Sequence, residues 1–150
     1  MKKIIVVYAS MTGNTQDMAE AIAEGLREIG GEVTVKDAFD ANASEFLEYD
    51  GIVLGAYTWG DGDLPDEFLD FYEEMDGLDL QGKPGAAFGS GDTSYSLFCA
   101  AVDTIQAKLR KLGSDLKLDG LKLELSPSSE EREQCREFGR SFMRQVLSQQ

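Results

Sequence analysis

The chain has 150 residues, a length typical of one domain with a sizeable core. Its 28 acidic and 14 basic residues give a formal net charge of −14, which disfavours binding to nucleic acid or to an anionic membrane surface. The sequence contains no histidine and only two cysteines, Cys99 and Cys135, so it indicates neither a metal site nor a disulfide framework. Residues 1–150 are predicted to form a single domain. Because the apolar run after Lys3 is too short for a secretory signal and the cysteines are few, the predicted location is the cytoplasm.

The first predicted strand, residues 4–8, is followed by a turn at 10–15 and by a helical pattern that continues to about Ile29. A strand that turns directly into a helix leaves the first N–H groups unpaired at the positive end of the helix dipole. The hydroxyl and amide groups of this turn add donors, so we interpret it as a phosphate cradle. No Lys or Arg lies between Lys3 and Arg27, which excludes the Walker pattern and favours a single terminal phosphate. The alternative is an ordinary turn in which Ser10 or Thr12 caps the helix.

Predicted strands and helices alternate along the rest of the chain. Apolar patterning and turn residues predict strands at residues 32–36, 51–56 and 85–89, and a broken last strand region at 116–118 and 121–125. They predict helices at residues 43–47, 66–75 and 98–112, and a final helix that opens with the capping box at 128–131. The polar alternation of 32–36 and 121–125 is typical of sheet edges, whereas the unbroken apolar run 51–56 is typical of a strand covered on both faces.

This order of elements predicts the fold class. A strand–helix unit repeated about five times implies a parallel sheet with helices on both faces, and right-handed crossovers favour the strand order 2-1-3-4-5. The prediction is an α/β fold, a three-layer doubly wound five-stranded parallel sheet. Cys135 is expected to lie in the core, as is the apolar set of the helix at 66–75, which comprises Phe68, Leu69, Phe71, Tyr72 and Met75.

Three loops of unusual composition follow the first, third and fourth predicted strands. These strands are neighbours in the predicted order, so the loops meet at the carboxyl edge of the sheet. The first loop offers the phosphate cradle, and the other two each present an aromatic residue, Trp59 and Tyr95, among glycines and small polar residues. Two aromatic rings beside a phosphate site can hold a flat heteroaromatic ring between them. The ligand implied is FMN or, less specifically, a mononucleotide.

The residues of these loops resemble those of a known family. The motifs Ser10-x-Thr12-Gly13-Asn14-Thr15, Thr58-Trp59-Gly60-Asp61 and Gly89-x-Gly91-Asp92-x-Ser94-Tyr95 resemble the three FMN-binding loops of the flavodoxins. The resemblance covers essentially the whole chain. It is to the short-chain type, because the segment between Gly113 and Ser128 leaves no room for an extra loop in the fifth strand.

The resemblance implies a flavodoxin-like fold and a low-potential one-electron carrier with non-covalently bound FMN. Such a protein has no substrate of its own and shuttles electrons between redox partner proteins. Residues 10–15 would hold the FMN phosphate with help from Thr58, while Trp59 and Tyr95 would lie on the two flavin faces. The implied cofactor-binding residues are Ser10, Met11, Thr12, Gly13, Asn14, Thr15, Thr58, Trp59, Gly60, Asp61, Ser90, Gly91, Asp92, Tyr95 and Cys99.

Acidic residues are concentrated on or beside these loops. Negative charge around the cofactor disfavours a further anion, so we expect a strongly negative potential for the second electron. The acidic stretch at 61–70 is interpreted as a docking rim that attracts reductases and acceptors with basic surfaces. The protein is expected to act as a monomer.

Two other functional classes use the same or a related topology. A signalling receiver needs paired acids at the end of the first strand, where this chain has Tyr8-Ala9-Ser10. Among enzymes, a small phosphatase needs a Cys-x5-Arg loop and a flavin reductase needs a second nucleotide site, and the sequence shows neither. An FMN-dependent electron carrier is therefore the leading interpretation.

Overall fold

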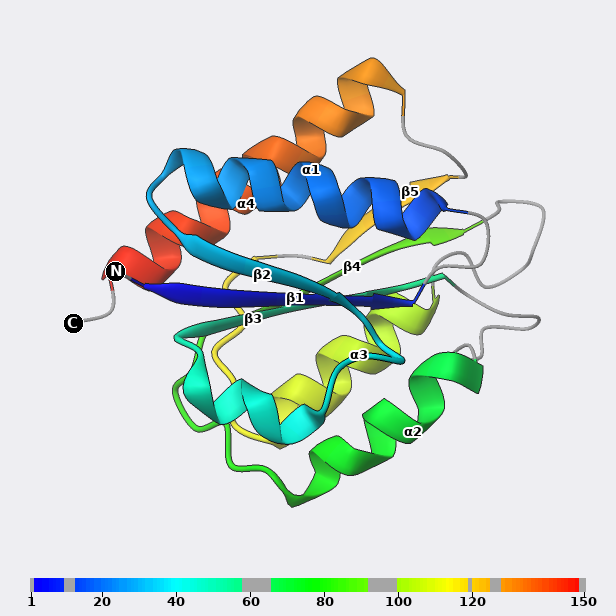
Figure 1. The fold of residues 1–150 in the computed structure, drawn as a ribbon, viewed down its shortest axis with the longest axis vertical. Coiled ribbons are helices and arrows are strands. Elements are labelled where there is room, and N and C mark those ends of the chain that lie inside the picture. Colours follow the sequence, from blue (N-terminus) through cyan, green and yellow to red (C-terminus); the bar gives the residue numbers. More distant parts are fainter. Residues whose placement is uncertain are drawn as a thin grey trace.

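The computed structural model describes residues 2–9, 13–57, 66–91, 100–118, 120–124 and 128–148. The strands are β1 (Lys3–Ala9), β2 (Glu32–Asp37), β3 (Gly51–Ala56), β4 (Gly85–Gly91) and β5 (Leu121–Glu124). The α-helices are α1 (Asn14–Glu28), α2 (Asp66–Glu74), α3 (Ala100–Lys111) and α4 (Ser129–Ser148), and two short 3-10 helices are η1 (Ala43–Glu48) and η2 (Met75–Gly77). The strands form one parallel sheet in the order β2-β1-β3-β4-β5, which confirms the predicted fold class (Figure 1).

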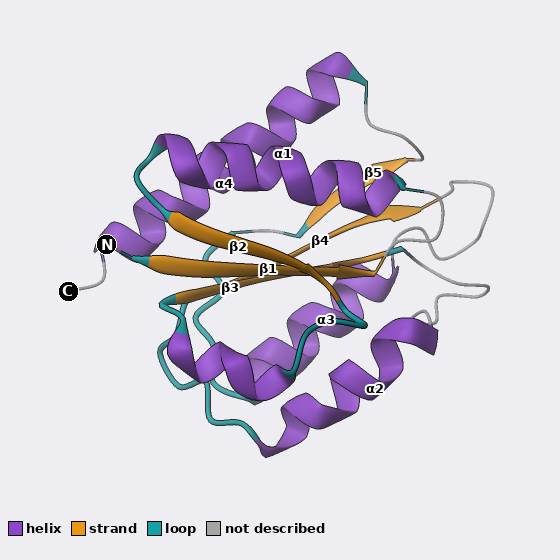
Figure 2. Cartoon of the chain, in the orientation of Figure 1, coloured by secondary structure: helices purple, strands orange, loops and turns teal. Residues whose placement is uncertain are grey.

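The sheet is the middle of three layers. Helices α1 and α4 cover one face, and α2, α3 and η1 cover the other (Figure 2). Two clusters of buried side chains fill the spaces between the layers, one around Phe142 and Met18 and the other around Phe46 and Phe71. Every residue of β3 is buried, as the unbroken apolar run predicts, whereas the side chains of β2 are half-buried or exposed, as expected of an edge strand.

Glycines end two of the helices and a capping box begins a third, as the sequence predicts. Gly30 follows α1 with φ +93° and Gly113 follows α3 with φ +94°, a conformation that a residue with a Cβ adopts only with strain. At the start of α4, the backbone N–H of Glu131 donates to the Ser128 hydroxyl at 3.1 Å, and the backbone N–H of Ser128 donates to the Glu131 carboxylate at 2.9 Å.

Helices α1 and α4 lie close together on their shared face of the sheet. A Cβ added at Gly25 would overlap the carbonyl oxygen of Arg136, and one added at Gly139 would overlap that of Ile22. The two glycines therefore allow the helix backbones to approach closely. Arg140 of α4 joins the pair from outside, because its guanidinium donates to Glu28 at 2.9 Å and to Glu133 at 2.7 Å.

Three details of the predicted elements are wrong. Leu69 is 38% exposed, because it lies on the outer side of α2 while Phe68, Phe71 and Met75 form the buried side. Residues 116–118 form no strand; next to them Asp115 makes only an isolated bridge with Pro84. Strand β4 continues two residues beyond its predicted end at Gly89, so Ser90 and Gly91 belong to the sheet and not to the loop.

Candidate functional site

The carboxyl ends of β1, β3 and β4 lie at one edge of the sheet, which is the edge predicted to carry the three loops. β1 and β3 are paired up to Ala9 and Ala56, and β4 is paired with β3 up to Phe88, which lies opposite Gly55. Figure 1 shows these strand ends pointing the same way, with the start of α1 on the same side of the molecule. The three predicted loops therefore follow strands that are neighbours in the sheet.

The structure describes five of the implied cofactor-binding residues: Gly13, Asn14, Thr15, Ser90 and Gly91. The others lie outside the described residues: Ser10, Met11, Thr12, Thr58, Trp59, Gly60, Asp61, Asp92, Tyr95 and Cys99. In the predicted docking rim at 61–70, Asp61 and Asp63 lie outside the described residues, and Asp66, Glu67 and Asp70 are described only as backbone of α2.

Gly13 is the N-cap of α1, in place of the hydroxylated residues that the alternative interpretation assigned to the cap. Its φ of +91° is left-handed, and a Cβ added there would have no atom of the described residues within 4 Å. Its carbonyl accepts the backbone N–H of Asp17 at 2.9 Å, which starts the helical ladder. The space that the missing Cβ leaves free lies at the amino end of a 15-residue helix, where N–H groups and the helix dipole favour an anion.

Thr15 and Ser90, two of the described site residues, are joined by a side-chain hydrogen bond. The Oγ1 atom of Thr15 lies 2.8 Å from the Oγ atom of Ser90, and the two residues are only 1% and 3% exposed. This hydrogen bond joins the first turn of α1 to the end of β4. Two hydroxyl groups that share one hydrogen bond use one proton between them, so the other hydroxyl proton can be donated to a third group.

The sequence did not predict this side-chain contact. The resemblance named Ser90 only as one of the implied cofactor-binding residues, and the predicted end of the strand at Gly89 placed Ser90 in the loop. The one available signal is that Ser90 is the only hydroxylated residue in Gly85–Gly91, a strand made otherwise of Gly, Ala and Phe. A single hydroxyl at the carboxyl end of such a strand indicates a specific hydrogen bond, because burying it without a partner is costly.

Glycines fit the ends of β3 and β4 to one another. A Cβ added at Gly55 would overlap the ring of Phe88, and one added at Gly89 would overlap the carbonyl oxygen of Ala56. The same Cβ at Gly89 would lie 2.7 Å from Cγ2 of Val102 in α3. The position of Ser90 is therefore fixed by the packing of the residue before it.

The described residues suit an anionic group of modest charge. They offer neutral donors, namely the first N–H groups of α1, the Thr15–Ser90 hydroxyl pair and the Asn14 amide, and no cation lies between Lys3 and Arg27 of the sequence. In the part of the chain that the structure describes, no group of three or more His, Cys, Asp and Glu side chains is placed to hold a metal ion. This donor set fits the single terminal phosphate of FMN.

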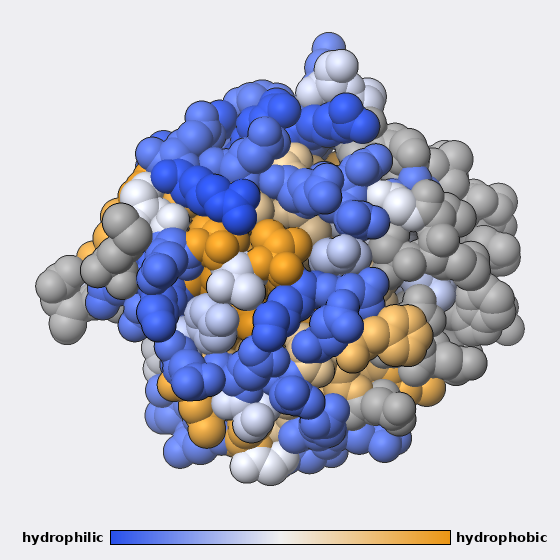
Figure 3. Space-filling model, viewed as in Figure 1, coloured by the Kyte–Doolittle hydropathy of each residue, from blue (hydrophilic) through white to orange (hydrophobic). Residues whose placement is uncertain are grey.

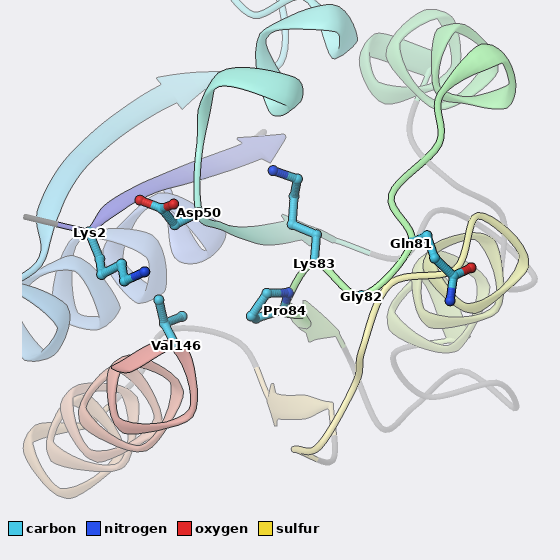
Figure 4. A pocket seen from close by; sticks show the side chains of 7 residues that line it. All are labelled: Lys2, Asp50, Gln81, Gly82, Lys83, Pro84 and Val146. Carbon is cyan, nitrogen blue, oxygen red and sulfur yellow. The ribbon is translucent and has the colours of Figure 1, made fainter. Parts of the chain in front are cut away.

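A cavity at the opposite edge of the sheet is unrelated to this site. It has a volume of about 250 Å³ and is lined by Lys2, Asp50, Gln81, Gly82, Lys83, Pro84 and Val146 (Figure 4). Lys2, Asp50 and Pro84 directly precede β1, β3 and β4, so the cavity lies at the amino ends of the strands. The Nζ atom of Lys83 donates to the carbonyl oxygen of Tyr49, and burial lowers the pKa of this lysine.

Comparison with known proteins places the chain in a family. The family model described as "Flavodoxin" matches residues 6–139. The chain is 50% identical over 143 residues to "Probable flavodoxin 2" of Bacillus subtilis (strain 168), and the match covers 95% of each protein. It is 37% identical over 134 residues to a flavodoxin of Maridesulfovibrio salexigens, a match that covers 87% of this chain and 92% of the relative.

The fold agrees with the sequence match. The crystal structure of oxidised flavodoxin 1 from Bacillus cereus is 50% identical and superposes with a TM-score of 0.92, covering 95% of this chain and 97% of that one. None of the helices in the described ranges is both long and apolar enough to cross a lipid bilayer. The chain belongs to the flavodoxin family and is an FMN-binding electron carrier, with no enzymatic reaction of its own.

Proposed function

We propose that the amino end of α1 and the end of β4 hold the FMN phosphate, with Thr15 as the donor and Ser90 as its support. The observation that carries this proposal is the 2.8 Å contact between the two buried hydroxyls. A phosphate oxygen accepts hydrogen bonds but is a poor donor at neutral pH. In the proposed arrangement the Thr15 hydroxyl donates a hydrogen bond to the phosphate, while its oxygen accepts a hydrogen bond from the Ser90 hydroxyl.

The remaining contacts of the proposed site are those that the resemblance of the three loops to the FMN-binding loops of flavodoxins implies. Residues 10–14 complete the phosphate site, Thr58 assists there, and Trp59 and Tyr95 flank the flavin ring. The backbone groups that contact the ring edge belong to Gly60, Asp61, Ser90, Gly91, Asp92 and Cys99. The support for these contacts is the order of the strands, which sets the three loops beside one another at one edge of the sheet.

FMN supplies the redox chemistry when it is bound, and the chain sets the conditions under which it works. The net charge of −14 raises the free energy of any additional negative charge on the protein. We therefore infer a low potential for the second electron, which becomes less negative when salt screens the carboxylates.

The carrier interacts with partner redox proteins, and we propose that their contact surfaces are basic. Net negative charge attracts a basic partner and speeds its approach, while it opposes contact between two copies of this chain. We accordingly propose a monomeric, single-domain protein that works in the cytoplasm. The reduced state expected there leaves Cys135, which is buried and free, as a thiol.

Titration of the apoprotein with FMN and with riboflavin tests the proposed phosphate site, because riboflavin lacks only the phosphate. Thr15→Val keeps the shape of the side chain but removes the hydroxyl, and hydrogen bonds to charged groups contribute about 1.5–3 kcal/mol. We expect Thr15→Val to weaken FMN binding at least about tenfold and to leave riboflavin binding unchanged within about twofold. Thr15→Ser should bind FMN as the unmodified protein does. An equal loss for both ligands would contradict the proposal.

A control variant shows whether a Thr→Val change far from the proposed site affects ligand binding. Thr34→Val makes the same change on the half-buried edge strand β2, which the sheet order separates from β4 by β1 and β3. It should alter the affinity for neither ligand.

A further inference from the structure

Phe39 is an aromatic side chain held in solvent by an ordered turn. It is 77% exposed and is the second residue after β2, which ends at Asp37. The backbone N–H of Phe39 donates to Oδ1 of Asp37 at 2.9 Å, and the backbone N–H of Asp40 donates to the carbonyl of Asp37 at 2.9 Å. Ala38 and Ala41, on either side of Phe39 in the sequence, are buried in the core. The turn is therefore anchored at both sides of Phe39 while the ring itself points outward.

This turn lies at the carboxyl edge of the sheet, because β2 runs parallel to β1. Its buried residues Ala38 and Ala41 belong to the same core cluster as Phe68 and Phe71 of α2, so the turn lies on the side of the sheet that α2 covers. Leu69 of α2 is 38% exposed and adds a second apolar side chain on a neighbouring element. Figure 3 shows orange surface where the end of β2 meets the start of α2.

Uncompensated negative charge surrounds the turn. Within the described ranges, Asp37, Asp40 and Glu20 take part in no ion pair, whereas Lys36 is paired with Glu45 at 2.6 Å. The pKa of Tyr8 is raised by its burial and then by the charges of Asp37, Glu20 and Asp40, so the three carboxylates act on one place.

The acidic surface continues along the neighbouring groove. This groove has a volume of about 520 Å³ between α1 and β2, and its lining includes Glu20 and Glu24, with Arg27 as the one cation among the described residues that line it. Arg27 donates to the carbonyl of Val33 at 3.4 Å and lies nearly two helical turns beyond Glu20. The part of the groove nearest the turn is therefore acidic.

We propose that Phe39, Leu69, Asp37 and Asp40, here called the Phe39 surface, bind the basic face of a redox partner, with Phe39 as the apolar anchor. The proposal rests on the proposed function, because it concerns a partner of the electron carrier. An exposed aromatic ring ringed by acids matches an apolar patch ringed by lysines or arginines. A second copy of this chain does not fit, because it would bring a second net charge of −14 against the same carboxylates.

The two kinds of residue contribute differently to binding. The carboxylates act over a distance, so their effect on association falls as salt rises. Phe39 acts only at contact, by burying its ring, so its effect on affinity persists at high salt. This difference separates an anchor from a residue that merely adds to the charge.

The test is calorimetric titration of the oxidised, FMN-loaded protein with ferricytochrome c, chosen as a basic haem protein with an apolar haem edge. We expect Phe39→Ser to weaken binding at least about fivefold at low and at moderate salt. Asp40→Asn should weaken binding at low salt alone. The control is Leu147→Ser, because Leu147 is 41% exposed but follows Val146 at the amino edge of the sheet; it should bind as the unmodified protein does.

Three results would overturn the proposal: unchanged affinity in Phe39→Ser, an equal loss in Phe39→Ser and Leu147→Ser, or no binding of ferricytochrome c by the unmodified protein. Failure here is distinct from failure of the proposed phosphate site. The first concerns a protein–protein affinity of the loaded protein, and the second concerns the preference of the apoprotein for FMN over riboflavin.

Discussion

The hydroxyl groups of Thr15 and Ser90 lie 2.8 Å apart although 75 residues separate them in the sequence. Thr15 belongs to the first turn of α1 and Ser90 to the end of β4, and β3 lies between β1 and β4 in the sheet. The hydrogen bond thus links the end of the first predicted cofactor loop, residues 10–15, to the beginning of the third. A substitution at either residue is expected to change the hydrogen bonding of the other.

The first prediction concerns the stability of the apoprotein. Ser90→Ala removes one of two buried partners and leaves the Thr15 hydroxyl without its bond, which costs about 1–3 kcal/mol of the free energy of unfolding. Urea unfolding followed by circular dichroism measures this loss. Ser44→Ala is the matched control, because Ser44 is exposed in η1 and should lose no more than about 0.5 kcal/mol. Equal stability of Ser90→Ala and the unmodified protein would show that the bond contributes nothing.

The second prediction concerns the packing of β3 against β4. In Gly89→Ala the new methyl group meets the carbonyl oxygen of Ala56, which belongs to the backbone and cannot move aside cheaply. We expect a loss of about 1–3 kcal/mol in the free energy of unfolding. Gly77→Ala is the control, since a Cβ there has no atom within 4 Å, and its stability should be unchanged or slightly higher. If the two variants unfold at the same urea concentration, the close approach at Gly89 carries no constraint.

Much of the fold could be predicted because local signals and tertiary packing agree. The apolar run at β3 is unbroken and every residue of it is buried, while β2 and β5 alternate and lie at the sheet edges. Gly30 and Gly113 end their helices because only glycine adopts their positive φ without strain. Cys135 was expected in the core and is fully buried.

The errors come from positions where packing decides between equal local signals. Leu69 fits an apolar stripe as well as Phe68 does, yet the helix turns it outward, and no local feature separates the two. Leu116 and Leu118 alternate as a strand would, but the chain pairs with the sheet only through Asp115 before β5 begins. At the site, the strand order that brings the loops together could be predicted, whereas the Ser90–Thr15 contact depends on where β4 ends.

The third prediction is a dependence of stability on pH. Hydrogen bonds from Arg140 hold the pKa of Glu133 and of Glu137 below the usual value in the folded state. The unfolded chain therefore binds protons more readily, so the stabilisation is present above the ordinary glutamate pKa and is lost as the pH falls through the lowered values. The urea midpoint should fall as the pH is lowered from about 6 to about 3.

A variant assigns the pH effect to its source. Arg140→Gln removes the donor shared by Glu133 and Glu137 and should make the decline toward acid pH shallower. Arg110→Gln removes an exposed cation of α3 and should leave the steepness of the decline unchanged. A decline that is the same in all three proteins would place its origin elsewhere.

The fourth prediction concerns the thiol of Cys135. Burial raises its pKa to about 12, with a further contribution from Glu131, so the reactive thiolate is scarce at about pH 8. In a Cys99→Ala protein, where Cys135 is the one remaining cysteine, a coloured disulfide reagent should react only after the chain is unfolded by denaturant. Reaction at the rate of a free peptide thiol in the folded protein would mean that Cys135 is not buried in the core cluster.

The most direct test of the central claim, that Ser90 orients the Thr15 hydroxyl toward the FMN phosphate, is a double-mutant cycle on FMN affinity. Apoprotein with Thr15→Val, with Ser90→Ala and with both changes is titrated with FMN and with riboflavin. We predict that Ser90→Ala alone weakens FMN binding about threefold to tenfold, leaves riboflavin binding unchanged, and has no further effect in the Thr15→Val protein. Additive losses, or equal losses for FMN and riboflavin, would contradict it.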